Sequence, residues 1–126
     1  MTRPLMLATC LGLLAAALSA GGCGSYPAPT ERMTTSEAAI RAAEEVGSSG
    51  IPQAALYLKL AQEQTEKARR LMQDGYNERA ELTLKRAQAD AELAIAISKK
   101  EQAEGKKQEA QTKLEQAKAA AQKKGQ

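Results

Sequence analysis

The chain of 126 residues offers few side chains that could carry catalysis or hold a metal. It contains no histidine, and its two cysteines are Cys10 and Cys23. Imidazole and thiolate groups supply most metal ligands, nucleophiles and proton carriers in proteins. The adjacent acids Glu44 and Glu45 diverge by about 100° on a helix, so they do not form a paired-carboxylate site. We therefore expect no enzyme activity, no cofactor and no metal site.

Cys23 follows a segment with the composition of an export signal. Residues 1–22 begin with one basic residue, Arg3, continue with an apolar stretch over 5–18, and end in small residues. An apolar stretch of about 14 residues is shorter than the roughly 20 that span a bilayer as a helix. The segment therefore predicts a cleaved signal peptide. An ordinary secreted protein with a free thiol at Cys23 is one alternative.

The residues before Cys23 resemble the lipobox of bacterial lipoprotein precursors. Gly21, Gly22 and Cys23 fit that motif, whereas Ala20 stands where leucine is usual. The resemblance implies cleavage before Cys23, lipidation of its sulfur, and partnership with a membrane through that lipid. Gly24, in place of an aspartate, implies the periplasmic face of the outer membrane. Cys10 in "LATC" is a weaker candidate, because only about five apolar residues would separate it from the basic start.

Residues 23–33 predict a flexible tether, because Pro27 and Pro29 lack backbone donors and glycine and serine precede them. The pair Thr34 and Glu37 has capping-box spacing, which predicts a short helix over 35–46. Gly47 is suited to end that helix in a left-handed conformation.

Two longer helices follow, and each has apolar residues at alternating steps of four and three. The first is predicted to end near residue 74. Gly75 suits its C-terminal cap and Asn77 the next N-cap, and so short a connection makes the two helices antiparallel. We predict an all-α fold in which residues 34–104 form a short helix plus a long antiparallel helical hairpin. The apolar positions of its two long helices are Ala54, Leu58, Ala61, Thr65, Ala68, Met72, Ala80, Leu84, Ala87, Ala91 and Ala94.

The stretch "ARRLMQDGYNERAELTLKRA", residues 68–87, resembles the middle of a tetratricopeptide repeat. Only one copy is present, whereas a peptide-binding superhelix needs about three. Residues 41–96, from "RAAEEVG" to "RAQADAELAIA", more closely resemble a family of bacterial envelope lipoproteins of unassigned function. In some relatives this module precedes an OmpA-like peptidoglycan-binding domain. The resemblance implies a helical module at the cell envelope and brings no catalytic residues with it.

Residues 105–126 predict a helical or frayed tail rich in lysine, glutamate and alanine. Gly105 should weaken a thin seam formed by Ala103, Ala110, Leu114, Ala117 and Ala121. A basic arm for peptidoglycan or an acidic protein and a solvated tail without a partner both fit this composition. The net charge of +3, which falls to +2 without the signal segment, does not favour nucleic-acid binding.

The hairpin also carries more apolar side chains than one stripe on each helix must bury. Some should cover the short helix, and the rest could meet an envelope protein or a second copy of the chain. The candidates for this interaction surface are Leu56, Tyr57, Leu82, Ile95 and Ile97.

Overall fold

The computed structural model describes residues 25–125, so the predicted signal segment, Cys10 and Cys23 lie outside the described part of the chain. The elements are α2 (Thr30–Glu45), the short 3-10 helix η2 (Ser48–Gly50), α3 (Pro52–Gln73) and α4 (Asn77–Lys124). No strand occurs in this range, which confirms the all-α prediction. None of its helices has a stretch long and apolar enough to cross a membrane.

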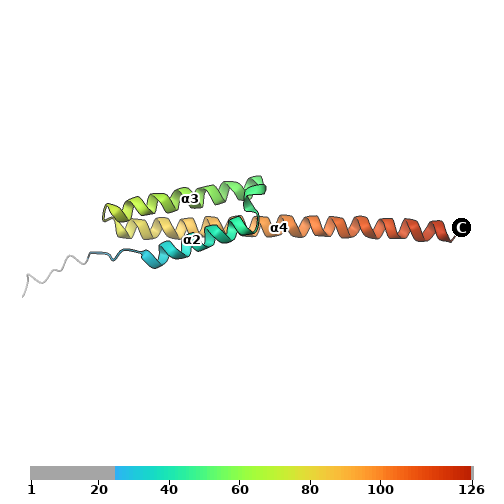
Figure 1. The fold of residues 1–126 in the computed structure, drawn as a ribbon, viewed down its shortest axis with the longest axis horizontal. Helices are drawn as coiled ribbons and strands as arrows, with labels where there is room; N and C mark the ends of the chain where they lie inside the picture. The colour runs from blue at the N-terminus through green and yellow to red at the C-terminus, as the bar shows by residue number, and fades with distance from the viewer. Residues whose placement is uncertain (1–24, 126) are drawn as a thin grey trace, which may run out of the picture.

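Helices α3 and α4 form the predicted antiparallel hairpin (Figure 1). Gly75 lies in the left-handed region, with a φ of 80°, at the turn between them. Their contact is built largely from alanine, whose small side chain lets two helix axes approach closely. The buried residues of the two helices are Ala54, Leu58, Ala61, Thr65 and Ala68 on α3, and Ala80, Leu84, Ala87, Ala91, Ala94 and Ser98 on α4.

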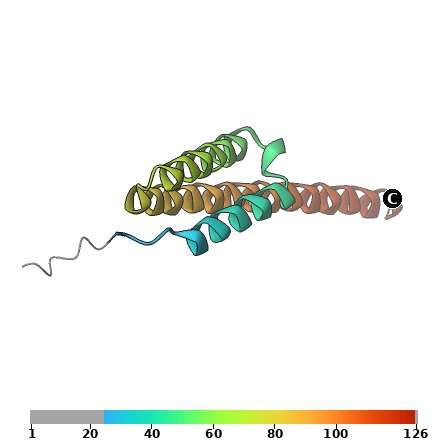
Figure 2. The same ribbon diagram turned by 60° about the vertical axis from the view of Figure 1, so that its left-hand side comes forward.

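Helix α2 lies along α4 and diverges from α3 (Figures 1 and 2). Ile40 and Ala43 are its buried apolar residues. The buried hydroxyl of Ser36 donates a 2.9 Å hydrogen bond to the backbone carbonyl of Leu84 on α4. A bond of this kind requires close approach of the two backbones, so α2 is held against α4 in one register.

A second buried hydroxyl pair holds η2 against α4. The hydroxyl of Ser98 donates to the carbonyl of Ala94 at 2.9 Å, and the hydroxyls of Ser48 and Ser98 lie 2.8 Å apart. Since one hydroxyl carries one proton, Ser48 is the donor in this pair. The last buried residue of α4 is therefore joined directly to the loop between α2 and α3.

Helix α2 begins at Thr30, four residues before the predicted capping residue, and the capping-box prediction was wrong. The hydroxyl of Thr34 bonds to the carbonyl of Thr30 inside the helix, and Glu37 pairs with Arg69 of α3. Pro29 is buried at the N-cap. Helix therefore replaces the last four residues of the predicted tether.

Helix α4 continues through Gly105 to Lys124 and extends well beyond the other two helices (Figure 1). A glycine costs a helix about 1 kcal/mol relative to alanine, which does not break this one. All side chains from residue 99 to residue 125 are exposed. We call residues 99–124 the free part of α4, which is about 39 Å long at 1.5 Å per residue. Near its start, the amide of Gln102 donates a 2.8 Å hydrogen bond to the carbonyl of Val46.

The alanine packing of α2 predicts the effect of enlarging one side chain. Ala43→Leu should lower the free energy of unfolding by about 1–3 kcal/mol, because Ala43 is fully buried and the added atoms would lift α2 from its neighbours. Ala38→Leu, at an exposed position of the same helix, should change it by less than about 0.5 kcal/mol. Urea denaturation followed by circular dichroism measures both values, and equal effects would contradict the packing described here.

Candidate interaction surfaces

The structure divides the five predicted interaction residues into two groups. Leu56 and Leu82 are 55% and 53% exposed. Tyr57, Ile95 and Ile97 are partly buried and pack against the core. They complete the three-helix body, so their side chains offer less surface to a partner than the sequence suggested.

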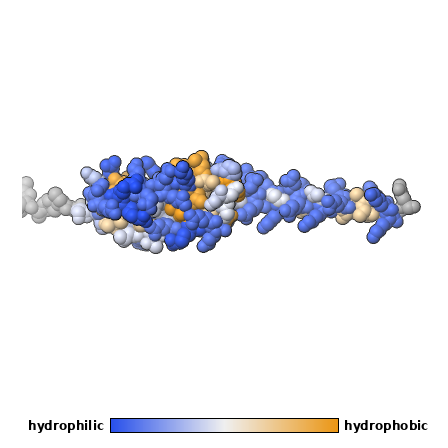
Figure 3. Space-filling view, turned by 45° about the horizontal axis from the view of Figure 1, so that its top comes forward, coloured by the Kyte–Doolittle hydropathy of each residue, from blue (hydrophilic) through white to orange (hydrophobic). Residues whose placement is uncertain are grey.

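The two exposed candidates do not share one site. Leu56 lies near the start of α3, close to η2, whereas Leu82 lies near the start of α4, at the other end of the antiparallel hairpin. Two further leucines of α4, Leu93 and Leu114, are 40% and 54% exposed. Figure 3 shows hydrophobic surface gathered over one part of the three-helix body, while the free part of α4 is mostly hydrophilic from the same side.

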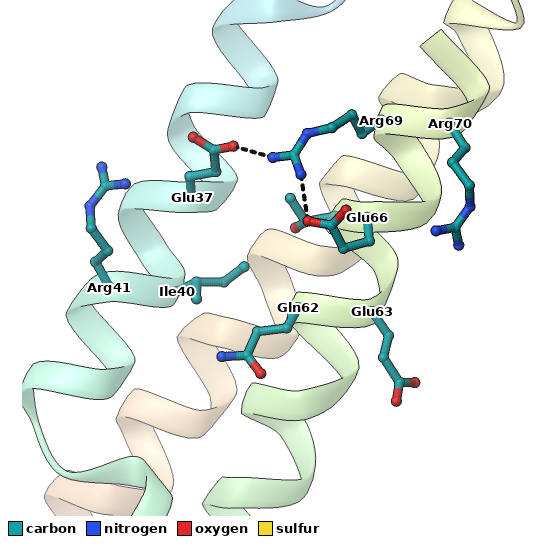
Figure 4. A pocket seen from close by; sticks show the side chains of 9 residues that line it. Glu37, Ile40, Arg41, Gln62, Glu63, Glu66, Arg69 and Arg70 are labelled. Atoms are coloured by element: carbon teal, nitrogen blue, oxygen red, sulfur yellow. Dashed lines mark hydrogen bonds and ion pairs between the residues drawn. The ribbon is translucent and has the colours of Figure 1, made fainter. Parts of the chain in front are cut away.

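A charged groove of about 500 Å³ runs between α2 and α3 (Figure 4). Ile40 and Thr65 are buried at its base. Arg69 of α3 lies at its centre and pairs with Glu37 of α2, with 2.8 Å between Nη2 and Oε1, and with Glu66 on its own helix. These carboxylates raise the pKa of Arg69, chiefly through the hydrogen bond to Glu66.

The polar side chains of this groove connect α2 to α3. The guanidinium of Arg69 is shared by two carboxylates and holds α2 to α3 where the helices diverge. Beside it, the amide of Gln62 donates a 2.9 Å hydrogen bond to Glu44, again from α3 to α2. Such exposed pairs contribute about 1 kcal/mol or less each, so the groove orients α2 more than it stabilises the fold.

The residues just before α2 are bound to the start of α4. The phenol of Tyr26 donates a hydrogen bond to Glu81, and the amide of Asn77 donates a 2.8 Å bond to the Tyr26 carbonyl. Asn77 therefore holds the preceding segment, and the prediction that it caps its own helix was wrong, since the N-cap is Tyr76. The hydrogen bond from Tyr26 lowers the pKa of Glu81, with a further contribution from Lys85, and raises the pKa of Tyr26.

Within residues 25–125, no group of three acids, cysteines or histidines is placed to hold a metal ion. The predicted lipidation residue, Cys23, lies outside the described residues, three positions before the segment that Tyr26 fixes to α4.

The contact between Tyr26 and Glu81 predicts a measurable titration. In the intact chain, the carboxyl of Glu81 should titrate below its ordinary pKa of 4.5, and Tyr26→Phe should raise that pKa by removing its main hydrogen-bond donor. Because the folded-state pKa is lowered, the contact stabilises the fold at neutral pH, and its effect is lost as the pH falls through that value.

Carboxyl chemical shifts followed by NMR measure this titration. Lys85→Met, which removes the second partner, is the matched variant and should raise the pKa of Glu81 less than Tyr26→Phe does. An unchanged pKa in the Phe variant would show that the N-terminal segment does not dock on α4 in solution.

Comparison with known protein families gives a match to more than half of the chain. Residues 31–110 match the family described as a domain of unknown function, DUF4398, which covers most of the chain from the start of α2 into the free part of α4. No curated protein sequence and no solved structure matches the chain. The chain therefore belongs to the DUF4398 family.

Proposed function

We propose that the protein is a lipid-anchored module of the bacterial cell envelope that acts through structure and interaction with other molecules and has no catalytic activity. The observation that carries this proposal is the elongated shape of the described chain. Its N-terminal end leads to Cys23, and the other end is a long, fully exposed helix (Figure 1). The groove between α2 and α3 has charged groups that neutralise one another, and no nucleophile and base are paired there.

The N-terminal segment would hold the body close to the lipid. Only two residues, Gly24 and Ser25, lie between Cys23 and Tyr26, which is bound to α4, and three extended residue steps span at most about 11 Å. The body would therefore lie near the headgroups of the periplasmic face of the outer membrane. This distance is much shorter than a free tether over residues 23–33 would allow.

The anchor predicts the mass of the mature N-terminal peptide. The protein isolated from membranes should begin at Cys23 and carry diacylglyceryl and acyl groups, and Cys23→Ser should abolish both the added mass and the membrane association. Cys10→Ser is the matched control and should leave both unchanged, because Cys10 lies inside the predicted signal. An unmodified thiol at Cys23 in the mature protein would overturn the anchor.

A second candidate function is peptidoglycan binding through the tail. The excess of exposed lysines in the tail favours this function. Residues 99–124 hold eight lysines against four glutamates, and all of them are exposed. Only two of these lysines, Lys100 and Lys118, form ion pairs within the described chain. The remaining ammonium groups are available to an anionic polymer.

Two sets of substitutions separate the candidates. Lys106→Gln, Lys113→Gln and Lys123→Gln lower the charge of the tail while keeping its helix. If the tail binds peptidoglycan, the triple variant should lose salt-sensitive sedimentation with purified cell wall. If the body binds an envelope protein, Leu56→Gln should instead lose a defined crosslinked species in intact cells.

Lys59→Gln, one turn from Leu56 on α3, is the control for the second arm and should keep that species. If every variant keeps its helicity and none loses either cell-wall sedimentation or the crosslinked species, the interaction proposal is overturned. The protein would then be a plain spacer.

A further inference from the structure

Helix α4 has a row of exposed residues along the face that α2 and α3 do not cover. We call this row the outer seam of α4. The buried contacts of α4 end at Ser98. Leu82 and Leu84 lie about 200° apart around the helix, and Leu84 faces the core while Leu82 is exposed. The outer face contains two sets of exposed residues spaced by seven. One set is Leu82, Ala89, Ala96, Ala103, Ala110 and Ala117, and the other is Arg86, Leu93, Lys100, Lys107, Leu114 and Ala121.

The packing of the monomer does not account for this repeat. Of the four strongly exposed leucines of the described chain, Leu93 and Leu114 lie on this seam within residues 89–121, and Leu82 lies on the same face nearer the start of α4. An apolar repeat of seven residues is the pattern of helices that pair in a left-handed supercoil, because the seam stays facing the partner only when the helices wind around each other. Gly105 lies away from the seam and does not interrupt it.

We propose that the outer seam of α4 pairs with the same seam of a second copy of the chain, in antiparallel orientation. This deepens the proposed role as an interaction module by naming the partner of one surface. In an antiparallel pair, each layer of the seam joins one residue of the first set with one of the second. Centring the pair near residue 105 places Leu93 opposite Ala117 of the second copy, and Leu114 opposite Ala96.

Side-chain size favours this orientation. With the same register, Lys100 lies opposite Ala110 and Lys107 opposite Ala103, so each long side chain meets an alanine. The lysine stems can pack along the alanine surface while their ammonium groups reach water. A parallel pair would instead stack Lys100 on Lys100 and Lys107 on Lys107, with repulsion in two layers. It would place leucine on leucine at Leu82, Leu93 and Leu114, and alanine on alanine with poor filling in the remaining layers.

The distribution of charge also favours the antiparallel pair. Residues 25–98 carry nine basic and eleven acidic side chains, whereas residues 99–124 carry a surplus of four positive charges. Antiparallel pairing places the basic tail of one copy beside the acidic body of the other. Beside the seam, Glu92 meets Lys113 and Asp90 meets Lys118. Lys99 and Lys106 repel each other, and Glu104 repels Glu104 of the second copy. The pairing should therefore be sensitive to salt.

The size of the contact sets its expected strength. Residues 89–121 of both copies overlap over about 50 Å, and a strip about 10 Å wide buries roughly 1,000 Å² in total. Specific interfaces of this size are at the weak end, so we expect a dimer that dissociates on dilution. The starts of the two α4 helices lie about 85 Å apart in such a pair, so both lipid anchors reach one membrane when the pair lies along its surface.

Cysteine crosslinking tests the orientation in the full chain carrying Cys10→Ser and Cys23→Ser. A mixture of the Ala96→Cys and Leu114→Cys proteins should form a disulfide-linked dimer of one chain of each kind under mild oxidation. Each protein alone should form little, because its cysteines lie about 27 Å apart in the antiparallel pair. The control mixture of Ala96→Cys with Thr112→Cys, which faces away from the seam, should not crosslink.

Efficient crosslinking of Leu114→Cys with itself would overturn the antiparallel pair in favour of a parallel one. Absence of the mixed dimer would overturn pairing through this seam altogether. The proposed interaction with another envelope protein would then still be open to test, because the crosslinked species dependent on Leu56 is measured separately.

Sedimentation analysis gives an independent test of the dimer. Ala103→Lys with Ala110→Lys should shift the protein from a concentration-dependent dimer to a monomer at all concentrations, with helicity unchanged, because each new ammonium group would lie opposite Lys107 or Lys100 of the second copy. Gln108→Lys with Thr112→Lys adds the same charge on the opposite face and should preserve the dimer. A monomer in the starting protein, or an equal loss in both variants, would overturn the proposal.

Discussion

Close approach of α4 to its neighbours through alanine is the constraint on which the rest of the structure depends. Eight of the eleven buried apolar residues are alanines. A methyl group contributes little burial free energy, about 0.8 kcal/mol for a buried carbon of this kind, so the body needs many such contacts along long helices. Short distances between the backbones also make the buried serine bonds possible, since the hydroxyl of Ser36 reaches the backbone of α4 directly. The size of each buried side chain therefore sets the distance between the helix backbones. A larger residue at one contact would separate the helices at the neighbouring contacts as well.

The long hairpin was predictable because its information is local. Alternating steps of four and three identified the buried alanines, and Gly75 identified the turn. The start of α2 was not predictable from the same kind of signal. Thr34 and Glu37 have the spacing of a capping box, yet Glu37 is used in a tertiary pair with Arg69, which is 32 residues away. Asn77 was misassigned for the same reason, because its partner is the backbone of Tyr26.

The interaction candidates were only partly predictable, because an apolar residue beside a stripe can serve either the core or a partner. Ile95 and Ile97 complete the three-helix body, and Leu56 and Leu82 remain exposed. The choice depends on where α2 and η2 lie across the hairpin. That placement is fixed by Ser36 and Ser48, which are short polar residues without a periodic signal. Leu114 was predicted only as part of the thin seam of the tail, and the seven-residue repeat that joins it to Leu93 extends over most of α4.

The extent of the family match bears on why α4 is so long. The match continues to Ala110, twelve residues beyond the last buried residue of the helix. The family domain therefore includes a stretch of helix that has no buried side chain, although the amide of Gln102 in it donates a 2.8 Å hydrogen bond to the carbonyl of Val46. Helices in water derive most of their stability from packing of an apolar face. We infer that a helix extending this far beyond its neighbours presents a surface that acts outside the body. The proposed antiparallel pairing along the outer seam of α4 would use that surface.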